Sequence, residues 1–534
     1  MKPSSLVKII DDKFNLDTDL VKGVFVGATS QSRIVYNSQT DKSTSNSVYN
    51  IQTPGTKAVL DPNAYIHYSV ESVFTVTPQV GIAPLALGST ISLRQYPVSG
   101  EISGMSLSYA NSTVNLQQSG EILYPLDRYF GILSEKNKDL GGVPNYPDNS
   151  LEYSDLIAKV SNPLSSGNEI DRRHRGDFII TVISNVAGSS SATVRFETYE
   201  PLFLLGGGLG NTTTASGPGL TGLDKLTLLV SYRNDLYRFW STSQTNITSI
   251  VSTFFNAPQL ILNWSQPPPS LALDITKRSL IVPHTTINMF TSSSTSIASG
   301  SSFQYSFQNI QQSNVANCIF VFGQVVQQDK DWTSTDSFAS IEKMDIVVGT
   351  KSSQFSQYSK FDLYNIAVEN GLKNMSYSDF AQNCGSVMKI LPGRNIAVSD
   401  SGLLTAGSKE SVNIQITATF KNNYLSTKNF TFYAVTFTEG YLEIGSNSQL
   451  QVSTGFSERD VYEASYGNKD VFTAKGEGLT EAIGKIVRLG RNFYDSVNTG
   501  VELASEIIGG KVIGGKTIGG KSLSREQLME INRK

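Results

Sequence analysis

The chain has 534 residues, with 43 basic and 46 acidic side chains and a formal net charge of −3. Only 17% of its residues are charged, against about 25% in ordinary soluble domains, and this near-neutral balance argues against a coat for nucleic acid. Aromatic residues make up 10% of the chain, which excludes a disordered protein, and the many Thr, Val, Ile, Tyr and Phe residues favour strands.

The first half reads as a series of strands. Residues 1–25 are weakly patterned, and we expect them to form an N-terminal arm. Apolar and polar residues alternate over 65–76, and this period of two is typical of a half-buried strand. A helix is predicted at 151–160, where Ser150 can cap the first turn. Four further strands are predicted, at 178–186, 193–198, 226–232 and 259–264.

A proline-rich segment divides the chain. Prolines lack an N–H donor and stiffen the backbone, so residues 266–270 cannot lie inside a sheet and are expected to form a linker. Strand patterns resume beyond it. The composition and the repeated pattern predict a mainly β protein with two β-sandwiches in tandem, residues 26–265 and 271–455, hinged at the prolines.

The second half has its own strand and helix signals. Strict alternation predicts a strand at 412–420, and two more runs follow at hairpin spacing, at 430–437 and 441–444. Residues 361–368 are predicted to be a helix that ends at Asn370-Gly371, because glycine is common just past a helix terminus.

The C-terminal segment, residues 456–534, differs from the rest. Apolar residues fall at helical spacing over 479–508 and predict one amphipathic helix. An Ile-Gly-Gly-Lys repeat starting at Ile508 follows, and its paired glycines favour a flexible tether over a helix or a packed strand. From Lys475 onward, ten basic and seven acidic residues give a net charge of +3. The cations expected to contact an interior surface, DNA or a membrane are Lys485, Arg488, Arg491, Lys516 and Lys521. Docking of this helix on the protein itself or on a neighbouring subunit is the interpretation that we favour over such contacts.

No catalytic or metal-binding constellation stands out. The His and Cys residues are too few and too scattered for a zinc site, so we expect no metal, no cofactor and no enzymatic activity: they are His67, His174, His284, Cys318 and Cys384. The two cysteines are expected to be buried free thiols. The first apolar run is too short for a secretory leader, and no run is long enough to span a membrane as a helix.

Three other motifs are interpreted as incidental. The glycine-rich 206–210 lacks the strand–loop–helix setting of a dinucleotide site, and Arg175-Gly176-Asp177 fits a charged turn before a strand. Six Asn-x-Ser/Thr sequons reflect a chain rich in these residues, at Asn111, Asn211, Asn246, Asn263, Asn374 and Asn429.

Several longer stretches carry a family resemblance. In the second half they are 341–349, 362–373, 385–398, the strand at 412 and 432–440; in the first half they are 200–204, 219–228 and 235–240. In order and spacing they resemble the double jelly-roll major capsid proteins of adintovirus- and polinton-like DNA viruses, over roughly residues 30–450. The resembling stretches are structural rather than catalytic.

The resemblance implies a structural function. Three chains would form a homotrimer with a six-fold outline, a capsomer that tiles an icosahedral shell in the virion. Its partners would be neighbouring capsomers, penton proteins and other minor capsid proteins, and assembly would take place in the host cytoplasm or nucleus. Apolar-x-Gly-Gly-x sites of this kind are cut by the adenovirus-like proteases of such viruses, so Gly509, Gly510 and Lys511 are candidates for maturation cleavage.

Other functions share this composition. A single-jelly-roll capsid protein of a small RNA or single-stranded DNA virus is one, although the proline linker and the repeated strands count against it. A cell-surface adhesin or carbohydrate-binding sandwich would normally carry a signal peptide. A glycoside hydrolase would need paired carboxylates in a cleft.

Overall fold

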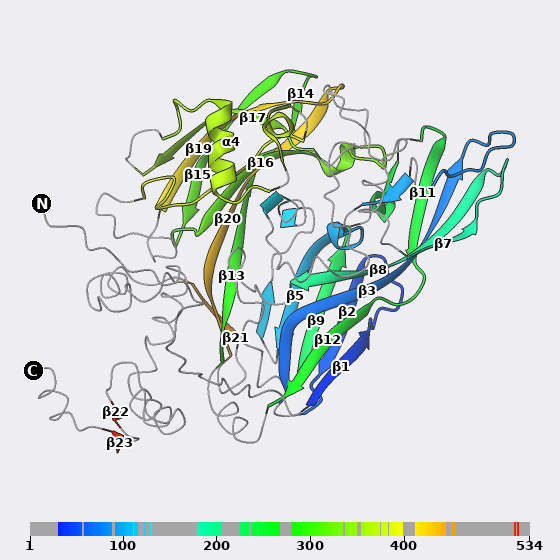
Figure 1. Cartoon of the computed structure of the whole chain (residues 1–534), viewed down its shortest axis with the longest axis horizontal. Coiled ribbons are helices and arrows are strands. Elements are labelled where there is room, and N and C mark those ends of the chain that lie inside the picture. The colour runs from blue at the N-terminus through cyan, green and yellow to red at the C-terminus, as the bar shows by residue number, and fades with distance from the viewer. Residues whose placement is uncertain are drawn as a thin grey trace, which may run out of the picture.

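A computed structural model describes most of the chain from residue 30 to residue 454. The described residues are 30–55, 58–87, 91–94, 96–109, 112–115, 122–123, 126, 129–130, 179–203, 225–233, 236–242, 244–267, 280–334, 337–349, 354–373, 375–382, 384–398, 412–444, 450–454, 517–518 and 521–522. Within them the strands form two β-sandwiches, which lie side by side (Figure 1).

The first sandwich packs two antiparallel sheets. One, the β3 sheet, has the order β1 (Ser30–Asn37), β12 (Gln259–Gln266), β3 (Val59–Val76), β8 (Ser191–Phe203) and β7 (Ile179–Ser184), and β11 (Ile247–Phe254) also pairs with β3. The other, the β9 sheet, has the order β2 (Asn46–Gln52), β9 (Lys225–Tyr232), β5 (Ile102–Tyr109) and β6 (Ser112–Asn115). A short pair, β4 (Ile91–Leu93) and β10 (Trp240–Thr242), lies with the 3-10 turns η2 (Ser99–Glu101) and η5 (Leu236–Phe239).

Alternating buried and outward-facing side chains show where the core of this sandwich lies. In β3, Ile66, Tyr68 and Val70 are fully buried, while His67 and Glu71, at alternate positions, lie on the outer face and are half-buried. The predicted strand at 65–76 is therefore confirmed, and the other four strands predicted in this half coincide with β7, β8, β9 and β12. The predicted helix at 151–160 lies outside the described residues.

The second sandwich also has two antiparallel sheets. The β16 sheet has the order β13 (Leu280–Thr291), β20 (Lys428–Ile444), β16 (Cys318–Val325) and β18 (Val387–Ile390), with β14 (Thr295–Ile297) and β21 (Leu450–Thr454) also pairing with β20. The β19 sheet consists of β15 (Ser302–Gln312), β19 (Val412–Lys421) and β17 (Ser340–Val348). Two helices, α4 (Lys360–Glu369) and α5 (Tyr377–Gln382), and the 3-10 turn η6 (Gln327–Asp329) complete it.

Strand β16 is buried along its whole length. Its sequence, Cys-Ile-Phe-Val-Phe-Gly-Gln-Val, does not alternate, because one face packs on the β19 sheet and the other is covered as well. Gly323 allows this close packing, since a Cβ there would lie 3.0 Å from the ring of Phe432 and 3.2 Å from that of Phe420. Strand β19, by contrast, alternates as predicted, with one face buried.

Helix α4 begins and ends where its sequence indicates. Ser359 and Asp362 form a reciprocal capping box, in which the Ser359 hydroxyl accepts from the Asp362 N–H and the carboxylate accepts from the Ser359 N–H. Asn370 is the C-terminal cap, and Gly371 follows with a φ of +100°. The helix predicted at 361–368 is therefore confirmed.

One predicted hairpin is wrong. Residues 430–437 and 441–444 belong to a single strand, β20, because Glu439-Gly440 continues the ladder with β13, where Gly440 faces His284. Strands β19 and β20 are not partners either; residues 422–427 connect the β19 sheet to the β16 sheet. The spacing indicated a turn, but the long ladder with β13 keeps the strand extended.

The boundary residues and the tail are described only in part. Strand β12 ends at Gln266 and β13 begins at Leu280, and 268–279 lie outside the described residues. So do 456–516, which include the predicted amphipathic helix. In the glycine repeat, Thr517–Ile518 (β22) pairs with Lys521–Ser522 (β23) in a two-residue ladder, where the sequence predicted no packed strand.

Candidate functional site

The two sandwiches meet at an interface that includes a short segment of the first half. Residues Ile122, Leu123, Leu126, Tyr129 and Phe130 have helical backbone and are buried in the core of the second sandwich, not the first. The Phe130 ring meets Phe320 edge to face at 5.2 Å, and the Tyr129 ring meets Phe338 at 5.8 Å. These aromatic side chains cover the outer face of the β16 sheet, which explains why β16 is apolar on both sides.

Polar groups hold the same segment in place. The Lys373 N–H donates to the Tyr129 carbonyl at 2.6 Å. The Lys389 ammonium lies 5.9 Å from the Phe130 ring centre and 5.8 Å from that of Phe320. The segment is therefore tied to the second sandwich by main-chain, cation–π and aromatic contacts.

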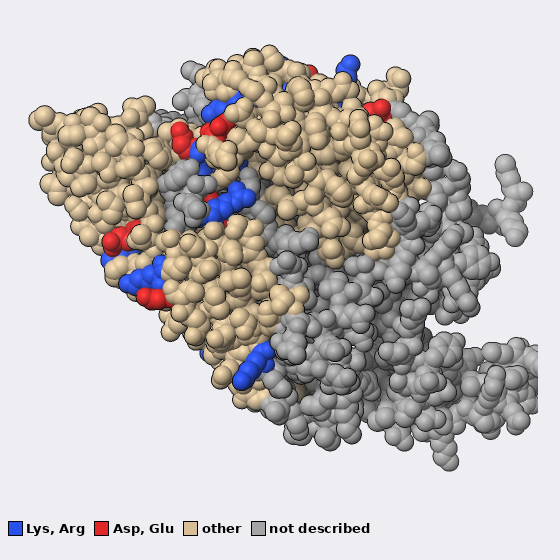
Figure 2. Space-filling view, turned by 180° about the vertical axis from the view of Figure 1, so that it is seen from behind, with Lys and Arg blue, Asp and Glu red and all other residues tan. Residues whose placement is uncertain are grey.

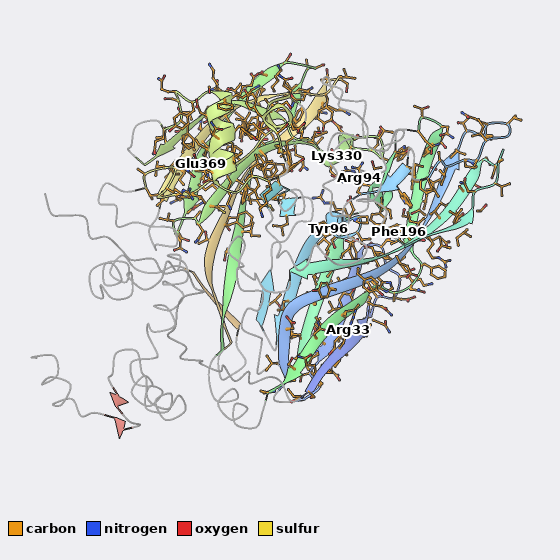
Figure 3. All side chains as sticks on the ribbon, viewed as in Figure 1. Arg33, Arg94, Tyr96, Phe196, Lys330 and Glu369 are labelled. Carbon is orange, nitrogen blue, oxygen red and sulfur yellow. The ribbon has the colours of Figure 1, made fainter. Side chains whose placement is uncertain are left out.

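A second contact joins the loop after β16 to the first sandwich. The Arg94 guanidinium donates to the Ser334 carbonyl at 2.9 Å and to the Asp331 carbonyl at 3.4 Å, and the Thr242 N–H donates to the Trp332 carbonyl at 3.0 Å. Arg238 donates to the Gln327 side chain at 2.9 Å. Arg94 and Lys330 both lie at this junction (Figure 3). A planar guanidinium suits such multiple contacts, and burial makes each of them hard to replace.

The loop itself is held by Asp331. Its carboxylate accepts from the Thr333 N–H at 2.7 Å, the Thr333 hydroxyl at 2.6 Å and the Ser334 hydroxyl at 3.1 Å. Burial raises the pKa of the Asp331 carboxyl, but these hydrogen bonds outweigh it, so the pKa lies below its usual value. The Trp332 side chain can then pack against the core of the first sandwich.

A buried carboxylate supports the first sandwich's side of the junction. Glu200, at the end of β8, is fully buried, and its two oxygens accept from the Val98 N–H at 3.2 Å and the Ser99 N–H at 2.6 Å, the start of turn η2. Burial raises the pKa of Glu200 to about 7, although hydrogen bonds from Ser99, Val98 and Thr198 lower it. Glu200 thereby positions the segment 94–101, which carries Arg94.

The surface of the described residues is sparsely charged. On the face seen in Figure 2, Lys, Arg, Asp and Glu gather at a few places, and broad areas between them carry none. One charged cluster on the β3 sheet is internally paired, because Arg195 donates to Glu71 at 2.8 Å and lies 3.2 Å from the Phe255 ring centre. Large uncharged surfaces are available for protein contacts.

The structure tests only some of the candidate residues. Cys318 and Cys384 are both buried thiols, as predicted. His67 lies on the outer face of the β3 sheet, stacked on Tyr199. Among the described residues, no three His, Cys, Asp or Glu side chains come together as a metal site would require, and no helix is long and apolar enough to cross a membrane. Of the sequons, Asn246, Asn263 and Asn429 lie in described residues.

The tail candidates and two motifs fall outside the described residues. They are Lys485, Arg488, Arg491, Gly509, Gly510, Lys511 and Lys516, the glycine-rich 206–210 and the tripeptide at 175–177. Lys521 lies in β23. Sequence reasoning missed Arg94, Arg238 and Glu200. Arg94 is a lone charge among uncharged residues, and in a chain with so few charges that contrast was the available signal for it.

Comparisons with known proteins agree with this architecture. The family model described as "Sputnik virophage major capsid protein 1st domain" matches residues 5–275, and "Major capsid protein V20 C-terminal domain" matches residues 285–440. No protein with a curated description matches the chain.

Two solved structures share the fold. The chain is similar to the Sputnik virophage structure determined by cryo-EM, with a TM-score of 0.74, 20% identity, and coverage of 89% of this chain and 97% of that one. It is also similar to the mavirus major capsid protein, with a TM-score of 0.64, 13% identity, and coverage of 86% and 97%. Both likenesses concern the double jelly-roll fold.

Proposed function

The chain belongs to the Sputnik virophage major capsid protein family, and we propose that three copies assemble into a capsomer with a six-fold outline. The protein is a viral major capsid protein, a structural component of the virion. It acts in the shell through the contacts that its surfaces make with other subunits.

The observation that carries the trimer proposal is the junction between the sandwiches. Two sandwiches of the same kind are joined in one chain by buried aromatic residues and by Arg94, so each chain supplies two similar building blocks in a set orientation. Three such chains supply six blocks around a three-fold axis. The sparse charge leaves large areas free for the obligate interfaces of such an assembly, which commonly bury about 2,000 Å² or more.

Light scattering on the purified full-length chain tests the trimer. We expect a mass three times that of the 58.1 kDa chain at micromolar concentration, and negative-stain images with a six-fold outline. A monomer under these conditions contradicts the proposal.

Further partners follow from the same function. We propose contacts with neighbouring capsomers, penton proteins and other minor capsid proteins in an icosahedral shell, and no enzymatic activity. Kinship with the capsid proteins of adintovirus- and polinton-like viruses is a narrower proposal, supported by the stretches at 341–349, 362–373 and 385–398. Two sandwiches in the described residues argue against a single-jelly-roll capsid protein.

The C-terminal tail has a separate proposed role. Its basic residues, including Lys485, Arg488 and Lys521, suit contact with DNA or a membrane on the inner side of the shell. Cleavage after Gly510 would detach the residues from Lys511 onward, since glycines enter a narrow protease groove without a Cβ clash.

A further inference from the structure

The two sandwiches repeat one strand order. In the first, the sheets run β1-β12-β3-β8 and β2-β9-β5; in the second, they run β13-β20-β16-β18 and β15-β19-β17. The strands therefore correspond in pairs: β3 to β16, β8 to β18, β12 to β20 and β5 to β17. Contacts made by an element of one sandwich can be compared with those of its counterpart.

The helical segments correspond as well. Residues 122–130 follow β5 and β6 and precede β7 and β8, while α4 and α5 lie between β17 and β18. The first of these segments reaches out of its own sandwich and covers the outer face of the β16 sheet, where Phe130 contacts Phe320. Helices α4 and α5 occupy the corresponding place in the second sandwich, and they also carry exposed apolar side chains.

Helix α4 carries apolar side chains on two of its sides, one buried and one exposed. Leu363 and Ala367 are fully buried against its own sandwich. On a second side Phe361 is 51% exposed and Val368 is 43% exposed, and Tyr364 between them is half-buried. Asp362, Asn365 and Glu369 occupy the remaining, solvent-facing side of the helix, so the exposed apolar side chains form a strip beside it. Exposed apolar side chains gathered in one place mark a contact surface.

Helix α5 extends this face. The Tyr377 side chain is 39% exposed, and its ring centre lies 5.2 Å from that of Phe361 and 5.6 Å from that of Tyr364. We call Phe361, Tyr364, Val368 and Tyr377 the α4 stripe. The Tyr377 ring packs edge to face on the other two rings, and such a preorganised aromatic surface loses little entropy on binding.

The repeat also identifies the surface that would receive this stripe. Phe320 and Phe322 stand where β16 is flanked by both β20 and β18. Tyr65 and His67 stand where β3 is flanked by both β12 and β8, and they alternate with core residues, so they lie on the outer face. The Tyr199 ring of β8 stacks on His67 at 4.4 Å. We call Tyr65, His67 and Tyr199 the β3 platform.

The stripe and the platform of one chain lie apart. In Figure 1, α4 lies on the second sandwich, whereas β3 and β8 lie in the first sandwich, apart from it. An α4 stripe that covers the β3 platform must therefore come from another molecule, and a second copy of this chain carries such a stripe.

We propose that the α4 stripe of one copy docks on the β3 platform of its neighbour, repeating between chains the contact that Phe130 makes with β16 within the chain. This inference rests on the proposed trimer. Each copy offers one stripe and one platform, so the contact is head to tail, and in the proposed trimer three such contacts close a ring. Each of the six sandwiches in the trimer would then contact the next one through the same kind of helix-on-sheet packing.

A charge placed in the stripe tests the docking. Val368→Asp puts a carboxylate into the interface, and Val80→Asp is the matched control, because Val80 is fully exposed in the loop after β3. We expect wild type and V80D to be trimers by light scattering and V368D to shift to monomers, with the same far-UV circular dichroism. A V368D trimer that resists dilution as wild type does overturns the docking and leaves the proposed function intact, whereas a monomeric wild type overturns both.

Cross-linking gives a second readout that does not depend on a destabilising variant. Chains with Val368→Cys are co-expressed with chains carrying Tyr199→Cys and treated with a short bis-maleimide; the native cysteines are buried. We expect a covalent pair between copies, and none when Val80→Cys replaces Y199C. Trimers that give no more V368C–Y199C product than this control overturn the docking.

Discussion

Glu200 makes the stability of the first sandwich depend on pH. Its pKa is raised from 4.5 to about 7 because the carboxyl is fully buried. Between these two values the folded chain holds a proton that the unfolded chain has released. The contribution to stability is therefore largest below pH 4.5 and is lost as the pH rises through 7. A difference of 2.5 pKa units (7 minus 4.5) corresponds to about 3 kcal/mol.

Replacing Glu200 by Gln removes this titration. The amide keeps the shape of the side chain but offers one oxygen to two N–H donors, those of Val98 and Ser99, so we expect lower stability at pH 5. The variant has no carboxyl group to ionise, so at pH 8 it avoids the cost of a buried charge that wild type bears. The difference in stability between the two proteins should therefore close or reverse at that pH. Urea denaturation of the full chain at pH 5, 6, 7 and 8, at one protein concentration, measures both effects.

The control and the refuting result are well defined. Glu369→Gln removes a carboxylate from the exposed end of α4, and its pH dependence should follow that of wild type. The acidic groups with lowered pKa values, Asp331 and Asp362, act below about pH 4, outside this window. If wild type and E200Q lose stability in parallel from pH 5 to pH 8, Glu200 is not the group that titrates.

Other changes have equally definite outcomes. Phe130→Ala should lower the free energy of unfolding by about 3 kcal/mol, because a buried ring between the sandwiches is lost; a change below about 1 kcal/mol by urea denaturation contradicts the junction. Gly385→Ala should prevent normal folding, since φ is +79° and a Cβ would lie 1.9 Å from the Phe338 carbonyl oxygen; soluble protein with wild-type melting contradicts this. Ser359→Ala removes the α4 cap and should cost about 1 kcal/mol in thermal melts at pH 7. In intact-mass spectra of mature particles we expect a chain that ends at Gly510, and a chain that ends at Lys534 rejects cleavage.

The sequence determined much of the strand content, for a simple physical reason. Where one face of a strand is buried and the other is exposed, as in β3 and β19, side chains must alternate, and the pattern can be read directly. Local capping is equally legible, so helix α4 and its end at Asn370 could be predicted. The composition also indicated large uncharged surfaces.

Tertiary structure decided the rest, because it depends on contacts between residues far apart in the chain. Strand β16 does not alternate, since residues 122–130 bury its second face. The 441–444 segment extends β20 because β13 pairs with it, although its spacing resembled a hairpin. The hydrogen bond between Arg94 and Ser334 joins residues 240 positions apart in the chain, and the one between Ser99 and Glu200 joins residues 101 positions apart. No local sequence pattern encodes contacts over such separations.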